Sequence, residues 1–465
     1  MPLRFKRSLR ELSLYCSINP VTERLLKSYP SLASQELQGK ESLAERAFLA
    51  WRGVSLERRL ELLKCLIAQL RQNTSNYASL ITQEMGKPIT QAEYEIGKSV
   101  RGCEFYLENA ARFLKPEVIP SDAGQSYIRY DPLGAILGIM PWNFPFWQVI
   151  RFAVPTLLAG NVVLLKHAPN VPGCALALER LFLAAGFPKG VFQALFISHQ
   201  TTQQLIGSPS VQGVSLTGSD RAGSAVAMAA GQALKKAVLE LGGSDPLVVF
   251  ADADLAQCVP IAVQSRMLNT GQSCIAAKRM IVVREVAKEF TERLVTAVQA
   301  LKVGDPMDPT TVVGPLARED LRDNLERQVK SAVRQGAKVL CGGRPLPGKG
   351  FFYQPTVLQA KAGMTVTTEE VFGPVATLLV VKDEAAAIRL ANETLYGLGA
   401  SLWTRDLAKA ERWVPAIEAG SVFVNGMVKS DPRLPFGGIK RSGFGRELSA
   451  AGIREFTNVK TVWIS

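Results

Sequence analysis

The chain has 465 residues, more than one hydrophobic core normally supports, so two or three domains are expected. Charged residues make up 20% and hydrophobic residues 47%, a balance that excludes a disordered or fibrous protein. The net charge is +13, but basic and acidic residues are interleaved, so we expect neither nucleic acid nor a membrane as a partner.

A local basic excess marks the start of the chain. Arg4, Lys6, Arg7 and Arg10 precede the first acid, Glu11. This pattern suits a transit-like or surface-binding segment, and equally a frayed terminus or a start codon placed too early. No long apolar core of a secretory signal is visible, so we expect a cytoplasmic protein.

The first structured part is predicted to be helical, because residues 41–113 carry apolar positions at helical spacing. Residues 132–150 contain no charge, but their three prolines would break a membrane-spanning helix. We predict a buried strand running into a loop there.

Short β-rich runs then alternate with amphipathic helices, which predicts parallel sheets with helices on both faces. The first series has strands at 135–139, 162–166, 191–197 and 214–216, with helices at 173–185 and 221–230. The second has strands at 247–250, 280–283, 375–381, 400–403 and 421–424, with helices at 255–268, 287–298, 318–334 and 384–392. The fold class is therefore α/β, with two tandem open α/β domains meeting near Leu241-Gly242-Gly243.

Two extended pieces, 126–130 and 458–464, belong to neither series. Strands left over from a compact domain pair with one another or with a second subunit.

Cysteine and histidine usage limits the chemistry. The seven cysteines are scattered without a CxxC pair, which predicts reduced thiols and no zinc site. His167 and His199 are the only histidines, too few for a multi-histidine metal centre, so we expect no metal.

Three polar residues have chemical potential, each with a plainer alternative. Cys274 follows a polar, Gly-containing turn, and is a nucleophile only if its thiolate is stabilised; a lone cysteine is more often a small buried hydrophobe. Glu240 lies in an apolar strand, where burial would make it a general base, unless it faces solvent at a sheet edge. Asn143 offers an amide to an oxyanion or caps a turn.

Two further features suit a dinucleotide. A strand is followed by Thr217-Gly218-Ser219 and, one turn later, Gly223, a geometry that offers backbone N–H groups to a pyrophosphate without the usual GxGxxG spacing. Lys166 ends another strand, where open α/β sheets bind ligands.

Together these segments resemble the aldehyde dehydrogenase superfamily from Ser17 onward. The resemblance is carried, in this order, by PWNFP at 141–145, Gly160-Asn161, the TGS turn at 217–219, ELGG at 240–243, GQSC at 271–274, EEVFGP at 369–374 and PFGG at 435–438. It implies an atypical Rossmann cofactor domain (1–119 and 133–240), a catalytic domain (241–428) and a β oligomerisation element (120–132 and 429–465). Such proteins form homodimers or homotetramers.

The resemblance also implies roles. Cys274 attacks the aldehyde, Asn143 holds the oxyanion, and Glu240 activates the water that hydrolyses the thioester. The resemblance also implies three sets of cofactor contacts. Lys166 and Glu370 hold the two riboses, Trp142 and Ser219 lie along the pyrophosphate, and Phe372 packs by the nicotinamide. Many NAD-preferring members have a glutamate where this chain has Pro169, so NAD and NADP both remain open, with NAD the first expectation.

Within the superfamily, residues 166–170 and 428–433 resemble the short, bacterial-type succinate-semialdehyde dehydrogenases. That resemblance implies that Arg151 reaches the substrate carboxylate, with Arg266 and Ser430 as further contacts. The alternative for Arg151 is a structural ion pair.

Three other functions stay open. One is oxidation of a different aldehyde, such as glutarate semialdehyde, a betaine-type or an aliphatic aldehyde. Another is transfer of the acyl group to CoA, which Glu240 argues against. The last is a non-enzymatic structural or nucleic-acid-binding protein, against which Cys274, Glu240 and Asn143 all stand.

Overall fold

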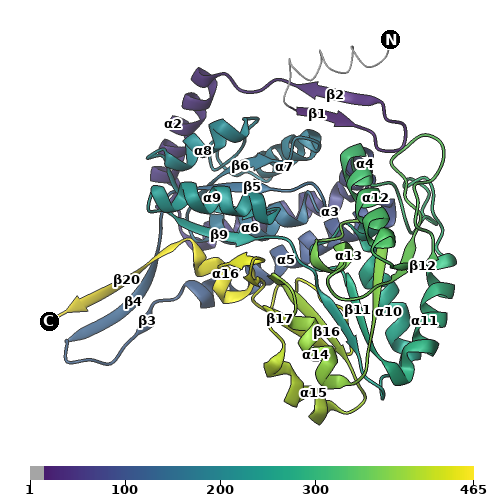
Figure 1. Cartoon of the computed structure of the whole chain (residues 1–465). Coiled ribbons are helices and arrows are strands. Elements are labelled where there is room, and N and C mark those ends of the chain that lie inside the picture. The colour runs from purple at the N-terminus through teal and green to yellow at the C-terminus, as the bar shows by residue number, and fades with distance from the viewer. Residues whose placement is uncertain (1–14) are drawn as a thin grey trace.

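A computed structural model describes residues 15–465 (Figure 1). The basic residues Arg4, Lys6, Arg7 and Arg10 lie outside the described residues. Two large sheets and one small sheet carry most of the strands, and helices cover the large sheets. The predicted α/β class is confirmed.

A hairpin and four helices come first. The hairpin consists of β1 (Tyr15–Ile18) and β2 (Leu25–Tyr29), which no sequence pattern predicted. The helices confirm the predicted helical section: α2 (Ser34–Trp51), α3 (Leu56–Gln72), α4 (Thr74–Met85) and α5 (Ile89–Leu114).

A six-stranded sheet follows, in the order β19-β9-β8-β5-β6-β7. Its strands are β5 (Ala135–Met140), β6 (Val162–His167), β7 (Phe192–Ala194), β8 (Val211–Thr217), β9 (Lys236–Glu240) and the antiparallel β19 (Gly443–Phe444). Strand β7 is shorter than the predicted 191–197. Because the chain builds outward from β5 in one direction and then in the other, right-handed crossovers place α6 (Trp147–Leu158) and α7 (Pro172–Ala184) on one face. The other face carries α8 (His199–Gly207) and α9 (Asp220–Gln232).

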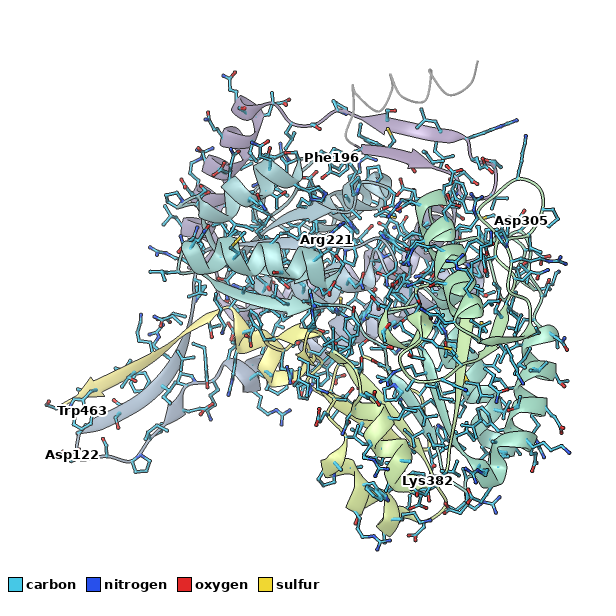
Figure 2. The ribbon with its side chains drawn as sticks, viewed as in Figure 1. Asp122, Phe196, Arg221, Asp305, Lys382 and Trp463 are labelled. Carbon is cyan, nitrogen blue, oxygen red and sulfur yellow. The ribbon has the colours of Figure 1, made fainter. Side chains whose placement is uncertain are left out.

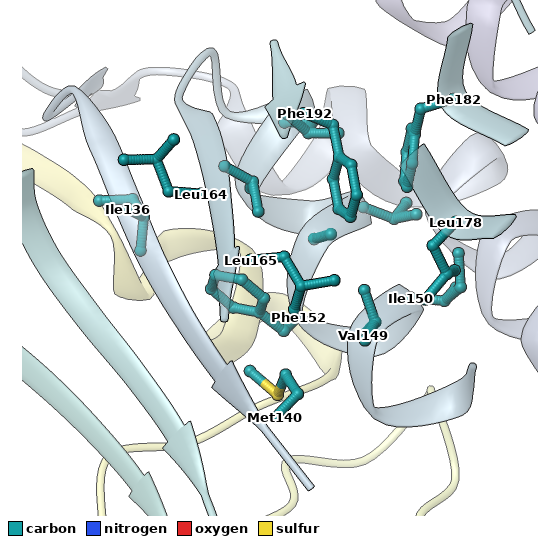
Figure 3. Packing of buried hydrophobic residues seen from close by; sticks show 14 of the residues in the cluster. Ile136, Met140, Val149, Ile150, Phe152, Leu164, Leu165, Leu178, Phe182 and Phe192 are labelled. Carbon is teal, nitrogen blue, oxygen red and sulfur yellow. The ribbon is translucent and has the colours of Figure 1, made fainter. Parts of the chain in front are cut away.

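The prediction of a loop up to residue 150 was wrong, because α6 begins at Trp147. All twelve of its residues are buried, so its sequence lacks the polar stripe from which an amphipathic helix is predicted. Figure 3 shows Val149, Ile150 and Phe152 of α6 facing Leu165 of β6.

The second large sheet has seven strands in the order β12-β13-β14-β11-β10-β16-β17. They are β10 (Pro246–Val249), β11 (Arg279–Val283), β12 (Lys338–Cys341), β13 (Thr356–Gln359), β14 (Val375–Val381), β16 (Gly399–Trp403) and β17 (Ser421–Val424), all parallel except β12. The helices around it are α10 (Leu255–Met267), α11 (Arg284–Gln299), α12 (Glu319–Arg334), α14 (Glu384–Asn392) and α15 (Leu407–Trp413). The segment from Glu240, at the end of β9, to Pro246, at the start of β10, connects the two large sheets.

The shorter elements lie in the connections. They are η1 (Leu268–Gly271), α13 (Thr365–Thr368), β15 (Tyr396–Gly397), η2 (Val414–Ala416), β18 (Ile439–Lys440) and α16 (Ser449–Glu455). No helix within residues 15–465 has the length and apolar character that crossing a membrane requires.

The two leftover segments form a projecting sheet. Strand β4 (Gln125–Pro132) lies between β3 (Glu117–Val118) and β20 (Thr457–Ile464). The predicted pairing of the two segments with one another is confirmed, since β20 and β4 pair antiparallel along their full length. Figure 2 shows Asp122 and Trp463 at the far end of this projection, away from both large sheets. Trp463 is 53% exposed and Val459 60% exposed, so the projection presents apolar side chains to its surroundings.

Candidate active site

A left-handed turn presents Cys274. Asn269, Thr270 and Gly271 have φ angles of 54°, 56° and 72°, directly after α10. Side chains other than glycine adopt this conformation at a cost of roughly 1–2 kcal/mol each, and such strain clusters at functional sites. A Cβ at Gly271 would clash with the Gly373 carbonyl, so only glycine fits the third position.

Hydrogen bonds join this turn to the loop after β5. Asn143 donates from Nδ2 to the Gln272 carbonyl at 3.0 Å, and Asn269 donates from Nδ2 to the Asn143 carbonyl at 2.8 Å. Asn143 and Cys274 are thereby brought together although 131 positions separate them in sequence (274 − 143).

Burial favours the protonated form of the Cys274 thiol. Burial raises its pKa to about 11, with the charges of Lys278 and Arg151 opposing the rise. Lys278 also donates from Nζ to the carbonyls of Ser273 at 2.9 Å and Cys274 at 2.6 Å. The thiol must therefore lose its proton before it can act as a nucleophile.

Glu240 has the properties of a general base for water. It is the last residue of β9 and is 2% exposed. Neither of its carboxylate oxygens has a hydrogen-bond partner among residues 15–465. Burial raises its pKa well above the usual range, and the nearby Glu447 raises it further, while Arg151 and Arg446 oppose. The alternative of a solvent-facing glutamate is excluded by this burial.

Arg151 lies beside the site but already has a carboxylate partner. Its Nε pairs with Glu447, its Nη2 donates to Thr217 Oγ1 at 3.3 Å, and its guanidinium lies 4.9 Å from the Phe436 ring centroid. The structural ion pair is thus what this structure shows. Contact between Arg151 and a substrate stays a prediction.

Arg266 was predicted to contact substrate, and this prediction is wrong. Its side chain is 0% exposed and its guanidinium donates only to backbone carbonyls, at Val375 (2.6 Å), Gly271 (3.1 Å), Val371 (2.9 Å) and Gly373. Through these hydrogen bonds Arg266 connects the left-handed turn to the start of β14. It shapes the site without facing it.

Replacing Arg266 with methionine should therefore destabilise the protein rather than change its specificity. Each buried carbonyl left without a donor costs about 1–3 kcal/mol, so we expect a loss on the order of 3–5 kcal/mol. Urea unfolding, with the exposed Arg293→Met as the matched control, measures it. A variant of unchanged stability with lowered affinity for a carboxylate-bearing aldehyde would restore the substrate role.

Ser430 is buried near Cys274, in a contact that sequence reasoning did not anticipate. Its Oγ accepts from Trp147 Nε1 at 3.0 Å and from Lys98 Nζ at 2.7 Å. Trp147 packs with Leu398, Phe436, Leu448 and Cys274 in one apolar cluster. Lys98 was missed because a single lysine on an otherwise mixed helix carries no signal, and its partner lies 332 residues away.

The carboxyl ends of β5 and β8 mark the candidate dinucleotide crevice of this sheet. The strand order reverses between these two strands, which is where open α/β sheets bind such ligands. Trp142 follows β5, and Ser219 caps α9 after β8. Lys166, in β6, is 4% exposed and forms no ion pair within residues 15–465, so its ammonium is available to ribose or phosphate oxygens.

The glycines of this crevice act differently from the prediction. The Gly218 N–H donates to the Glu240 carbonyl at 3.0 Å, and the Gly223 N–H to the Ser219 carbonyl at 2.9 Å. Neither is free for a pyrophosphate. A Cβ at Gly223 would clash with the Leu241 side chain, so this glycine instead allows α9 to pack closely on the end of β9.

The remaining predicted cofactor residues border the crevice. Glu370 accepts from the Gly243 N–H at 3.0 Å and pairs with Lys278 at 3.3 Å, while Phe372 meets Trp142 edge to face at 5.8 Å. Pro169 lies half-buried in the loop after β6. Since Lys278 also holds the Cys274 carbonyl, it connects the cofactor side of the site to the nucleophile.

Comparison with known proteins agrees with this geometry. Residues 10–462 match the model of the aldehyde dehydrogenase family. A protein named probable succinate-semialdehyde dehydrogenase (NADP(+)) from Synechocystis sp. is 49% identical, covering 97% of this chain and 99% of its own. Succinate semialdehyde dehydrogenase (NAD(P)+) Sad from Escherichia coli is 47% identical, covering 96% and 97%.

A solved structure shares the fold as well. Succinic semialdehyde dehydrogenase from Streptococcus pyogenes, in complex with NADP+, superposes with a TM-score of 0.95 at 36% identity and covers 97% of this chain and 99% of that one. With a family match over residues 10–462 and a relative that is 49% identical over 97% of its length, the chain belongs to the aldehyde dehydrogenase family.

Proposed function

We propose that this protein oxidises succinate semialdehyde to succinate with NAD+ or NADP+ as the oxidant. The observation that carries the proposal is the composition of the space around Cys274. Its walls are apolar, and two cations lie against two of its aromatic rings: Arg151 on Phe436 at 4.9 Å and Lys98 on Trp147 at 4.6 Å. A short chain with an aldehyde at one end and a carboxylate at the other matches this arrangement.

The chemistry follows from the residues present. The Cys274 thiol releases its proton to solvent as its sulfur bonds to the aldehyde carbon, and the Asn143 amide donates to the resulting oxyanion. When bound, a nicotinamide dinucleotide would supply the acceptor for the hydride that this adduct loses as it becomes the Cys274 thioester. Glu240 then takes a proton from water as the water oxygen attacks the Cys274 thioester. Glu240 returns this proton to the departing sulfur, so the carboxylic acid is released and the thiol is restored.

For the cofactor, we infer that NADP+ is accepted at least as well as NAD+, which reverses the order expected from the sequence alone. Pro169 carries no charge to repel a 2′-phosphate. Three basic groups lie near one another on this side of the crevice, since the charges of Lys166 and Arg221 lower the pKa of His199. The relatives' names mention NADP(+) and NAD(P)+.

For the domains and assembly, we propose the cofactor role for 1–119 and 133–240, and the catalytic role for 241–428. The projecting sheet of 120–132 and 429–465 would join copies into a homodimer or homotetramer, because β20 leaves one strand edge unpaired. We also propose that the protein works in the cytoplasm.

A substrate comparison tests the proposal. Initial rates with succinate semialdehyde and with butanal, which has the same chain length without the carboxylate, should differ by at least about tenfold in kcat/KM, the effect of one charge-assisted contact. Both NAD+ and NADP+ should support turnover. Equal kcat/KM for the two aldehydes would refute a carboxylate-bearing substrate.

A further inference from the structure

Three side chains from distant segments meet beside the nucleophile. Lys98 lies on α5, Trp147 at the start of α6, and Ser430 in the connection between β17 and β18. Lys98 Nζ donates to Ser430 Oγ at 2.7 Å and lies 4.6 Å from the Trp147 ring centroid. Trp147 Nε1 donates to the same Oγ at 3.0 Å. These three residues are called the Lys98 cluster below.

The Lys98 cluster adjoins the reacting thiol. Trp147 belongs to the apolar group that contains Phe436 and contacts Cys274. Lys98 and Cys274 also interact electrostatically, as do Lys98 and Arg151. The ammonium is therefore positioned at the edge of the space that a substrate on Cys274 would occupy.

The hydroxyl of Ser430 can still donate one hydrogen bond. A serine hydroxyl has two lone pairs and one proton. Both lone pairs receive donors, from Lys98 and from Trp147. Its proton must therefore point to an acceptor elsewhere, and a carboxylate is the strongest acceptor for it.

The charge of Lys98 also has no counter-charge. Within residues 15–465 Lys98 forms no ion pair. The nearby Glu95 is occupied by Lys87 and by the N–H groups of Phe146 and Trp147. Glu447 is paired with Arg151. Burying an ammonium beside apolar side chains without an anion costs free energy. The Lys98 cluster therefore favours the binding of a negatively charged group.

We propose that Lys98 is a specificity-determining residue, whose ammonium binds the distal carboxylate of the aldehyde together with the Ser430 hydroxyl. The inference rests on the proposed function, since it assumes a carboxylate-bearing substrate. It assigns the carboxylate contact to the unpaired Lys98 rather than to Arg151, whose charge Glu447 already balances.

The cluster has a pH dependence that a purely structural lysine would not show. Burial, then the charge of Arg151, lowers the pKa of Lys98 to about 7, with Glu95 and Cys274 opposing and Arg101 adding to the decrease. As the pH rises above about 7, Lys98 loses its charge and the carboxylate contact weakens. The ratio of kcat/KM for succinate semialdehyde to that for butanal should fall over this range.

Two substitutions and a control test the proposal. In Lys98→Met the ratio of kcat/KM values should fall about 10- to 100-fold, the effect of a charge-assisted hydrogen bond. In Lys98→Arg the charge is kept, so most of the ratio should remain and its dependence on pH should disappear. Lys64→Met, an exposed lysine on α3, serves as the matched control with an unchanged ratio.

Failure of this inference can be told from failure of the proposed function. If the wild-type protein prefers succinate semialdehyde and Lys98→Met keeps that preference, or loses activity equally with both aldehydes, Lys98 is not the carboxylate ligand. If the wild-type protein itself shows no preference for the charged aldehyde, the proposed substrate is wrong and this inference falls with it.

Discussion

Replacing Cys274 with alanine is expected to lower kcat for aldehyde oxidation by at least about 10⁴-fold, the scale on which removal of a covalent nucleophile acts. The thiol follows the left-handed turn by three residues, and no other described cysteine belongs to its apolar cluster. Alanine is smaller than cysteine, and the turn is held by Asn143 and Arg266, so the site should keep its shape. NADP+ binding, measured by titration calorimetry, should therefore persist.

A second cysteine provides the control. Cys258 is buried in α10, the helix that leads into the same turn, and Cys258→Ala should retain turnover while losing some stability. Substantial oxidation by Cys274→Ala, or a comparable loss of turnover in Cys258→Ala, would contradict the assignment of the nucleophile.

Replacing Glu240 with glutamine is expected to stop the reaction after hydride transfer. The amide has the size of the carboxylate but accepts no proton from water, so steady-state turnover should fall by about 10²- to 10⁴-fold. If Glu240 is mainly the base for water, each active site should still release one equivalent of NADPH in a burst. Mass spectrometry of the quenched variant should then find the acyl group on Cys274.

Chemical rescue and pH sharpen this test. Hydroxylamine attacks a thioester without needing a base, so it should restore turnover in Glu240→Gln. Because burial and Glu447 raise the pKa of Glu240, wild-type activity should rise with pH as Glu240 loses its proton, and Glu240→Gln should lack this rise. Full steady-state turnover by the variant would exclude Glu240 as the base.

The strands and helices of the second half were predictable because their periodicity is simple. Strand β14 (Val375–Val381) and helix α14 (Glu384–Asn392) have the predicted bounds. Strand β17 (Ser421–Val424) does too. Helix α6 was not predicted, because it is buried on every side and shows no polar periodicity. It also contains Pro155, a residue that argues against a helix.

Candidate residues that belong to motifs could likewise be named from the sequence, whereas residues positioned by tertiary contacts could not. Cys274, Glu240 and Asn143 could be named because motif and chemistry agree. Arg266 was misassigned because sequence cannot show that its guanidinium faces backbone carbonyls. Lys98 could not be named, because its role depends on a serine from the other end of the chain.

Product analysis of the wild-type protein tests the central claim most directly. With succinate semialdehyde and NADP+, and without CoA, succinate and NADPH should appear in a 1:1 ratio, because water is the acceptor that Glu240 activates. Cys274→Ala should form neither product. Formation of NADPH that depends on added CoA, or no NADH or NADPH from succinate semialdehyde with the corresponding oxidised cofactor, would contradict a hydrolytic oxidation through Cys274.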